Sequence, residues 1–375
     1  MTQMPPRVSP ALRLALASRY APQAAATWAA IRPQVHWPAL AAEATALGLA
    51  SLLYDVARDL PAGEASADVL TALRQEYAQA GLLNAYLLPQ FATALRALKN
   101  AGIEPILLKG TALLAVVYDN PALRPMSDLD LLIPFSALPA AEDCLARVGF
   151  LPLQPLPFAN ESGFFWNERL LQRRGWQPVS VELHWALLDI PYYARRWPEA
   201  DLRRRSQLAA LDGLPVRVLC PEDQLLHLCA HHFYHHQGQL VRVGPDVGHL
   251  LRRCAVDWDA FLARATACGL GLAARETLRW CMEAWHAPIP PPHRAAIEGL
   301  RAGPLQGWFQ RAQRREWLKV ARTGLTLPNW RLRLCYTWRQ LFPNRAYLLW
   351  RYGLPANTPA FRAYLARFRL RVGGS

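Results

Sequence analysis

The chain has 375 residues, of which 52% are hydrophobic and 19% are charged, and its formal net charge is +14. This composition is too apolar for a disordered chain, and the length suggests two or three domains. No run reaches 18 uninterrupted apolar residues, and the N-terminus lacks the apolar core and cleavage site of a secretory signal. We therefore expect a cytoplasmic protein with no membrane partner.

The order of predicted elements indicates an α+β fold, with a small mixed-sheet core embedded in helical segments. Residues 1–100 are predicted to be helical, because apolar residues recur about every 3.6 positions from residue 9. The α/β core is placed at 101–190, with an irregular Pro/Phe/Gly-rich insertion at 151–163. Residues 191–300 are predicted to be helical, with a helix opening at Pro221. Residues 301–375 form a basic, aromatic-rich helical region.

The most informative stretch of the core is LLKGTALLAVVYDNPALRPMSDLDLLI, residues 107–133. It reads as a strand, a glycine-marked turn, a helix and a second strand. Residues two apart in a strand share a face, so Asp128 and Asp130 point one way while Leu129 and Leu131 point toward a core. Two carboxylates placed in this way can jointly bind Mg²⁺.

The turn before the helix has the features of a phosphate site. Gly110 would let a phosphate approach the backbone, and Thr111 can cap the helix that follows. The positive end of the helix dipole also favours an anion at this position. Lys109 ends the apolar run before the glycine, where it either binds phosphate or only terminates the strand.

A third acid follows in PVSVELHWAL, residues 178–187, where apolar and polar residues alternate as in a half-buried strand. Glu182 and His184 share the polar face of this strand. Next to the strand of Asp128, Glu182 would complete a site for two cations about 4 Å apart around a phosphoryl group. We interpret His184 as a structural histidine that can also orient Glu182.

The order LKG(T)…LY…R…DLDLL…ELHW resembles the uncharacterised bacterial nucleotidyltransferase family of the polymerase-beta-like nucleotidyltransferase superfamily. The resemblance runs from about residue 85 to about 350 and includes LFPNRAYLLWRYG. It implies that Asp128, Asp130 and Glu182 are the catalytic, metal-binding acids. It also implies that the nucleotide is held by Lys109, Gly110, Thr111 and Arg124. From the residues alone, Arg124 could instead pair with Asp119 in a loop.

The expected activity is Mg²⁺-dependent transfer of a nucleoside monophosphate from an NTP to an acceptor hydroxyl or phosphate, with release of pyrophosphate. Two Mg²⁺ ions are expected, and ATP is the expected NTP. The acceptor remains open among small molecules, peptides, proteins and RNA. The alternative is a catalytically silent nucleotide- or nucleic-acid-binding protein that works through its basic C-terminal region.

A structural zinc protein is a third alternative, because HLCAHHFYHH, residues 227–236, contains histidines four apart that can share a helix face. We favour the interpretation that these histidines pack against the active-site cleft. Asp246 in GPDVGHLL matches an aspartate that follows the histidines in the same family. Seven scattered cysteines without a CxxC pair indicate neither a disulfide framework nor a zinc ribbon.

The charge is concentrated at the C-terminal end. Residues 301–375 contain fifteen basic side chains and one acid, Glu316, so they carry +14, the whole net charge of the chain. Tryptophans interleave with these arginines, as in surfaces that bind nucleic acid or another polyanion. We favour the simpler interpretation, in which the helices pack their aromatic residues on the core and expose their charge.

Overall fold

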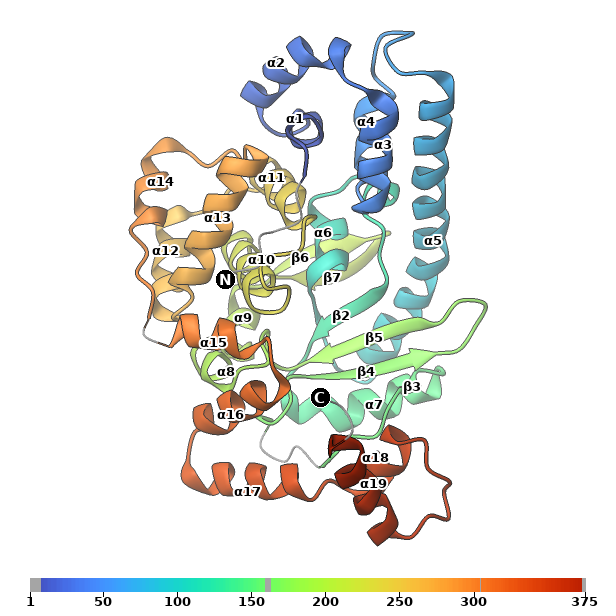
Figure 1. Cartoon of the computed structure of the whole chain (residues 1–375), viewed down its shortest axis with the longest axis vertical. Helices are drawn as coiled ribbons and strands as arrows, with labels where there is room; N and C mark the ends of the chain where they lie inside the picture. Colours follow the sequence, from blue (N-terminus) through green and yellow to red (C-terminus); the bar gives the residue numbers. More distant parts are fainter. Residues whose placement is uncertain (1–7, 159–162, 304, 373–375) are drawn as a thin grey trace.

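The computed structural model describes residues 8–158, 163–303 and 305–372. A mixed sheet of seven strands lies among helices, so the protein has the α+β fold that the sequence predicted (Figure 1). Part of the predicted insertion, residues 159–162, lies outside the described residues. Within the described ranges, no helix combines the length and the apolar character needed to cross a bilayer.

The N-terminal region is helical, as predicted. Its elements are α1 (Pro10–Ala17), α2 (Pro22–Ile31), the short 3₁₀ turn η1 (Arg32–Gln34), α3 (Trp37–Ala46), α4 (Ala50–Ala57) and α5 (Ala67–Asn100). Prolines stand in the first turn of α1, α2 and α3, where the missing N–H removes no helical hydrogen bond. The long helix α5 runs beside the sheet and packs on α7 and β5 (Figure 1).

The sheet has the strand order β3-β4-β5-β2-β1-β7-β6. β5 runs parallel to β2, and β7 parallel to β1, while the other neighbours are antiparallel. The strands are β1 (Ile106–Leu107), β2 (Asp128–Leu132), β3 (Leu151–Pro152), β4 (Glu168–Arg173), β5 (Val179–His184), β6 (Gln207–Leu211) and β7 (Leu214–Val218).

Strands β6 and β7 correct the prediction that residues 191–300 are helical throughout. They form a hairpin whose turn, Asp212-Gly213, has positive φ at both residues, 49° and 75°. Asp-Gly is a preferred sequence for such a two-residue hairpin turn. The turn signal was therefore present, but the flanking strands QLAAL and LPVRV lack the regular pattern of a half-buried strand.

The helices between β1 and the C-terminal region cover the sheet. They are α6 (Lys109–Val116), η2 (Pro121–Leu123), η3 (Phe135–Ala137), α7 (Leu138–Arg147), α8 (Pro191–Arg196), α9 (Glu199–Arg205), α10 (Pro221–Tyr234), α11 (Val243–Arg253), α12 (Trp258–Ala267), α13 (Gly271–Trp285) and α14 (Pro291–Glu298). Helix α10 begins at Pro221, as predicted, and packs on α11, α12 and α13. One large apolar core joins these helices to β2 and β5.

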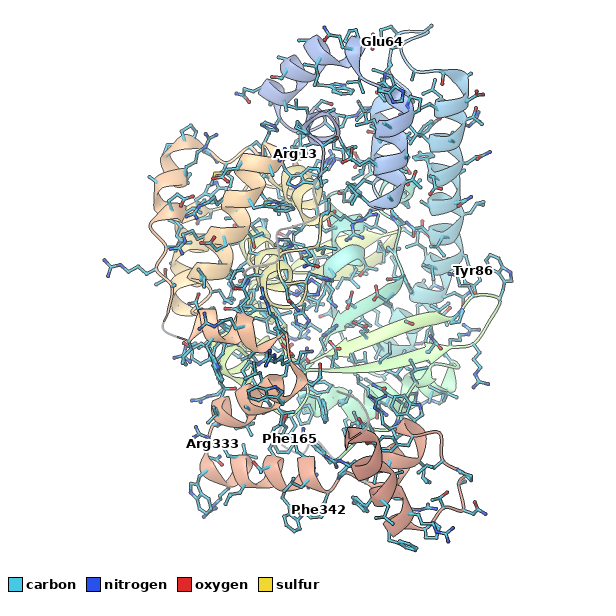
Figure 2. The ribbon with its side chains drawn as sticks, viewed as in Figure 1. Arg13, Glu64, Tyr86, Phe165, Arg333 and Phe342 are labelled. Atoms are coloured by element: carbon cyan, nitrogen blue, oxygen red, sulfur yellow. The ribbon has the colours of Figure 1, made fainter. Side chains whose placement is uncertain are left out.

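The C-terminal region is also helical, as predicted, and gathers at the lower end of the molecule in Figure 1. It contains α15 (Gln306–Ala312), α16 (Glu316–Thr326), α17 (Trp330–Leu341), α18 (Arg345–Arg351) and α19 (Ala360–Val372). A small apolar cluster, in which Phe165 meets Tyr336 of α17, attaches this region to the segment before β4, and Phe309 of α15 joins the main core. Figure 2 shows Phe165 close to α17, which carries Arg333 and is followed by Phe342.

Candidate functional site

The paired acids lie on two adjacent parallel strands, β2 and β5. The register sets Asp130 opposite Glu182 and Leu132 opposite His184. Between the acids of β2, Leu129 is fully buried. Alternation along each strand thus directs leucines into the core, and the carboxylates of both strands toward one shared face.

Lys109 lies against these acids, at the start of α6. Its Nζ is 2.6 Å from Asp130 Oδ1 and 3.3 Å from Glu182 Oε2. Burial opposes the lysine charge, but the charges of Asp130 and Glu182 outweigh it and raise the Lys109 pKa above its usual range. The backbone of Lys109 has φ 49°, a left-handed conformation that is uncommon outside glycine. Such strain is often found at functional sites.

His184 is a further member of the cluster. Its Nε2 lies 2.9 Å from Asp130 Oδ1 and 3.4 Å from Glu182 Oε2, and its Nδ1 lies 3.3 Å from Glu168 Oε2. Burial and Lys109 disfavour the imidazolium, yet the hydrogen bonds to Asp130 and Glu182 raise the His184 pKa to about 9. Glu168, on β4, was not predicted, because nothing in its local sequence places it beside His184.

The carboxylates of this cluster outnumber its two basic side chains, Lys109 and His184. The pKa of Asp128 shows this excess of negative charge. Burial, together with the charges of Asp130 and Glu182, raises the pKa of Asp128 to about 6. Glu182 behaves in the opposite way, because a hydrogen bond with His184 and the charge of Lys109 lower its pKa. A carboxylate with a raised pKa gains from an added cation, so the electrostatics favour metal binding here.

The donor set fits a metal ion. Within the residues that the structure describes, ligand atoms of Asp130, Glu182 and His184 converge to within 4.8 Å of one another. Asp128, predicted as a third ligand, is not in this convergent group but lies on the same strand face as Asp130. Carboxylate oxygens suit Mg²⁺, and a lysine that already bridges two of the acids shows that the site accepts a cation.

Arg124 lies on another side of the same site. Its guanidinium forms a forked pair with the buried Asp246, at 3.1 Å from Nε to Oδ1 and 3.1 Å from Nη2 to Oδ2. The Tyr118 hydroxyl donates a 2.7 Å hydrogen bond to Asp246 Oδ1. Arg124 therefore pairs with Asp246 and not with Asp119, which pairs with Arg253. The aspartate orients the guanidinium, and Nη1 donates a 3.2 Å hydrogen bond to the Pro125 carbonyl and lies beside Gly110.

The sequence predicted that a phosphate would approach the backbone at Gly110. In the structure the Arg124 guanidinium approaches it. A Cβ at Gly110 would lie 3.3 Å from Arg124 Nη1, so the glycine leaves room for this guanidinium. Thr111 does not cap α6, which corrects the prediction: its buried hydroxyl donates to the Leu108 carbonyl at 3.0 Å. Leu108 occupies the N-cap position without a side-chain hydrogen bond, so the first backbone amides of α6 remain available.

Six of the seven predicted site residues line one pocket of about 460 Å³, which we call the acid pocket. They are Lys109, Gly110, Arg124, Asp128, Asp130 and Glu182. Thr111 is the exception, because its side chain points into the core. Another wall comes from α10 and the residues directly after it, and it carries four histidines of the predicted run, His227, His231, His235 and His236.

Among the described residues, the one group of side chains that converges as metal ligands do is Asp130, Glu182 and His184. The histidines of residues 227–236 do not form such a group. Burial lowers the pKa of His227 and His231 well below the usual value, so both rings are neutral. Both ring nitrogens of His227 are buried without a hydrogen-bond partner. Such a ring can hydrogen-bond a ligand in the pocket, consistent with the prediction that the run faces the cleft.

A second pocket, of about 510 Å³, reaches Glu182 from another direction. Glu168 and Glu182 line both pockets. The far wall of this outer pocket comes from α18, with Tyr347, Trp350 and Arg351. Glu182 is thus accessible from two directions, one toward Arg124 and one toward the C-terminal helices.

The chain is similar to one family of known proteins. The profile of a family described as uncharacterised nucleotidyltransferase matches residues 33–286, which include every site residue from Lys109 to Asp246. No curated protein matches the chain. Among solved structures, an antigenic nucleotidyltransferase-like protein from Paracoccidioides brasiliensis is 16% identical, with a TM-score of 0.34. The alignment covers 58% of this chain and 95% of that one.

Proposed function

Because the chain belongs to the uncharacterised nucleotidyltransferase family, we propose that it transfers a nucleoside monophosphate from an NTP to an acceptor hydroxyl or phosphate and releases pyrophosphate. ATP is the proposed NTP. The observation that carries the proposal is the pairing of Asp130 with Glu182 across parallel strands, beside Asp128, in a pocket with Arg124. The acceptor belongs among small molecules, peptides, proteins and RNA.

Three carboxylates, those of Asp128, Asp130 and Glu182, would hold two Mg²⁺ ions. Bound Mg²⁺ neutralises a triphosphate and makes an acceptor hydroxyl more acidic. His184 and Glu168 would keep Glu182 oriented, since the imidazole lies between them. The ammonium of Lys109 is free to turn from the acids toward a phosphate, because its flexible side chain is reached from the pocket.

Arg124 and the backbone at Gly110 would hold the β and γ phosphates. The Asp246 pair fixes the plane of the guanidinium, and Nη1 beside Gly110 is the donor nearest the start of α6. A fixed guanidinium loses little freedom when it binds a phosphate. Backbone amides at the start of α6 add the favourable end of the helix dipole.

The outer pocket gives the acceptor a path that does not cross the nucleotide. Glu182 faces both pockets, so an acceptor beside Arg351 and Tyr347 would reach the acids from the side opposite Arg124. Among the described residues, Arg351 forms no ion pair, which leaves it available to an anionic group on the acceptor. Separate entry of the two substrates suits direct transfer, because the reacting groups then meet at the acids.

The test is incubation of the pure protein with Mg²⁺ and α-³²P- or γ-³²P-labelled ATP, with and without host lysate. Label from the α position, but not from the γ position, should enter an acceptor in a chelator-sensitive reaction. Transfer of γ label would identify a kinase instead. Absence of both reactions, with retained ATP binding, would favour a catalytically silent binding protein.

A further inference from the structure

The C-terminal helices expose an unusual amount of apolar surface. Of the large apolar side chains that the described residues expose, eleven of seventeen lie between residues 317 and 365. They are Trp317, Val320, Leu325, Trp330, Leu334, Trp338, Leu341, Phe342, Trp350, Phe361 and Leu365. The most basic end of the molecule is therefore also the end where exposed apolar side chains concentrate.

Helix α17 arranges four of these residues as a stripe. Trp330, Leu334, Trp338 and Leu341 follow one another at intervals of four, four and three residues, which places them on one helix face. Their exposed fractions are 65%, 63%, 64% and 53%. The opposite face is already covered, because Tyr336 is buried against Phe158 and Phe165. The stripe is thus a second apolar face that the fold leaves bare.

Arginines border the stripe. Arg331 follows Trp330, and Arg333 precedes Leu334. Successive residues are about 100° apart around a helix, so the two arginines lie at opposite edges of the stripe. The guanidinium of Arg331 lies 5.5 Å from the ring centre of Trp330. Long cationic side chains beside exposed rings can reach headgroups while the rings enter an apolar phase.

The apolar surface continues from α17 to α19. The ring of Trp338 lies 4.4 Å from that of Phe342, and Phe342 lies 6.2 Å from Tyr364. On α19, Phe361 and Leu365 are one turn apart and are 61% and 47% exposed. Figure 2 shows Phe342 at the lower edge of the molecule, facing away from the sheet.

We propose that this end of the protein binds the surface of an anionic phospholipid membrane. The α17 stripe would enter the interface, where tryptophan is favoured, and the arginines would contact lipid phosphates. Cations near an anionic leaflet are attracted to it, and the region carries fifteen basic side chains against one acid, although Arg322 is buried and paired with Asp189.

Charge and side-chain type favour this occupant over two others. A second copy of the same surface would bring two +14 regions together, and this repulsion opposes a symmetric dimer through the stripe. Single-stranded RNA suits a basic groove lined by stacking rings. The α17 stripe is a helix face on which Leu334 and Leu341 alternate with the tryptophans and offer no ring for a base.

The proposal changes the sequence-based expectation of no membrane partner. That expectation rested on the lack of a long apolar run, which bears on spanning segments only. Which face of α17 is covered follows from the packing of Tyr336, and this packing is not visible in the sequence. Peripheral binding requires an exposed amphipathic face and basic flanks, and both are present.

The experiment is co-sedimentation of the full-length protein with two kinds of vesicle, one of phosphatidylcholine alone and one with equal parts of phosphatidylglycerol. Binding should require phosphatidylglycerol and should fall with salt. The double substitution Trp330→Ser and Trp338→Ser should weaken it at least tenfold, on the order expected for loss of two interfacial rings. Neither substitution touches the acids, so ATP transfer serves only as an independent check of folding.

The matched control changes exposed apolar residues elsewhere, Trp176→Ser and Leu82→Ser, which are 87% and 72% exposed in the wild type. This variant should bind the anionic vesicles as the wild type does. Equal binding by the stripe variant would overturn the proposal, as would absence of vesicle binding. Tight binding to single-stranded RNA without vesicle binding would assign the surface to nucleic acid instead.

Discussion

Asp130 and Asp223 are both almost fully buried carboxylates beside basic side chains, yet their surroundings differ. Asp223, at the start of α10, receives two hydrogen bonds from Arg205, at 2.7 and 3.2 Å, and lies 3.4 Å from Arg264. Asp130 belongs to a cluster in which three acids face one lysine and one histidine, and it lines the acid pocket.

The difference teaches how to separate a structural charge cluster from a functional one. Around Asp223, the two acids Glu222 and Asp223 pair with Arg205 and Arg264. The pKa of each arginine is raised, because the attraction of the acids outweighs burial. Around Asp130 the acid is in excess, and burial with neighbouring charge raises the pKa of Asp128 to about 6. Proteins tolerate such excess where a ligand restores the balance.

The largest expected effect is the loss of unfolding free energy in Asp223→Ala. Asp223→Ala leaves Arg205 and Arg264 without their buried partner, and breaking such a pair costs about 3 to 5 kcal/mol. Urea unfolding should show this loss, while the folded fraction keeps its nucleotide affinity. An unchanged unfolding free energy would mean that the Asp223 cluster is not the stabilising one.

Asp130→Asn should do the opposite, with activity lost and the fold kept. It removes one ligand charge without changing shape, so ATP transfer should fall by at least about 10²-fold, as for loss of one transition-state charge partner. Asp143→Asn, on the exposed face of α7, is the matched control and should transfer normally. Near-normal transfer by the folded Asp130→Asn protein would remove Asp130 from the site.

Gly110→Val tests the phosphate side. A side chain there must displace Arg124 Nη1, which would lie 3.3 Å from the new Cβ. We expect about tenfold weaker Mg²⁺·ATP binding by calorimetry, or about 1.4 kcal/mol. An unchanged ATP affinity would move the phosphates away from Arg124.

Asp128→Asn should stabilise the metal-free protein by about 1 kcal/mol above pH 6, after allowance for solvent screening. The sign follows from a folded pKa of about 6 against an ordinary value of 3.8. Stability is therefore lost as pH rises through this window and stays lost above it. Thermal unfolding in chelator at pH 7.5 and pH 3.5 should show the gain only at the higher pH. An equal gain of Asp128→Asn over the wild type at both pH values would contradict a raised Asp128 pKa.

Much of this site could be predicted from local pattern. The alternation around Asp128 and Glu182 gave the shared strand faces, and the glycine of Lys109-Gly110 marked the start of α6. The register that sets Asp130 opposite Glu182 could not be predicted, because it joins strands about fifty residues apart through tertiary packing. For the same reason the sequence did not show that Lys109 bridges the acids, or that Glu168 contacts His184.

Two errors have local causes. Thr111 has a side chain suited to capping, but α6 starts at Lys109, so the threonine lies inside the first turn. The β6–β7 hairpin was missed because QLAAL does not alternate apolar with polar residues and LPVRV contains a proline, which is unfavourable inside a strand. Its Asp212-Gly213 turn was the available signal. The pairing of Arg124 with Asp246 spans 122 residues and has no local signature.

The most direct test of the metal site is anomalous diffraction from crystals soaked with Mn²⁺ and a non-hydrolysable ATP analogue. Mn²⁺ should appear at Asp128, Asp130 and Glu182, with the triphosphate toward Arg124 and the Lys109 ammonium moved from Asp130 to a phosphate. Mn²⁺ bound only by the histidines of α10, or no Mn²⁺ with Lys109 still bridging Asp130 and Glu182, would contradict the account.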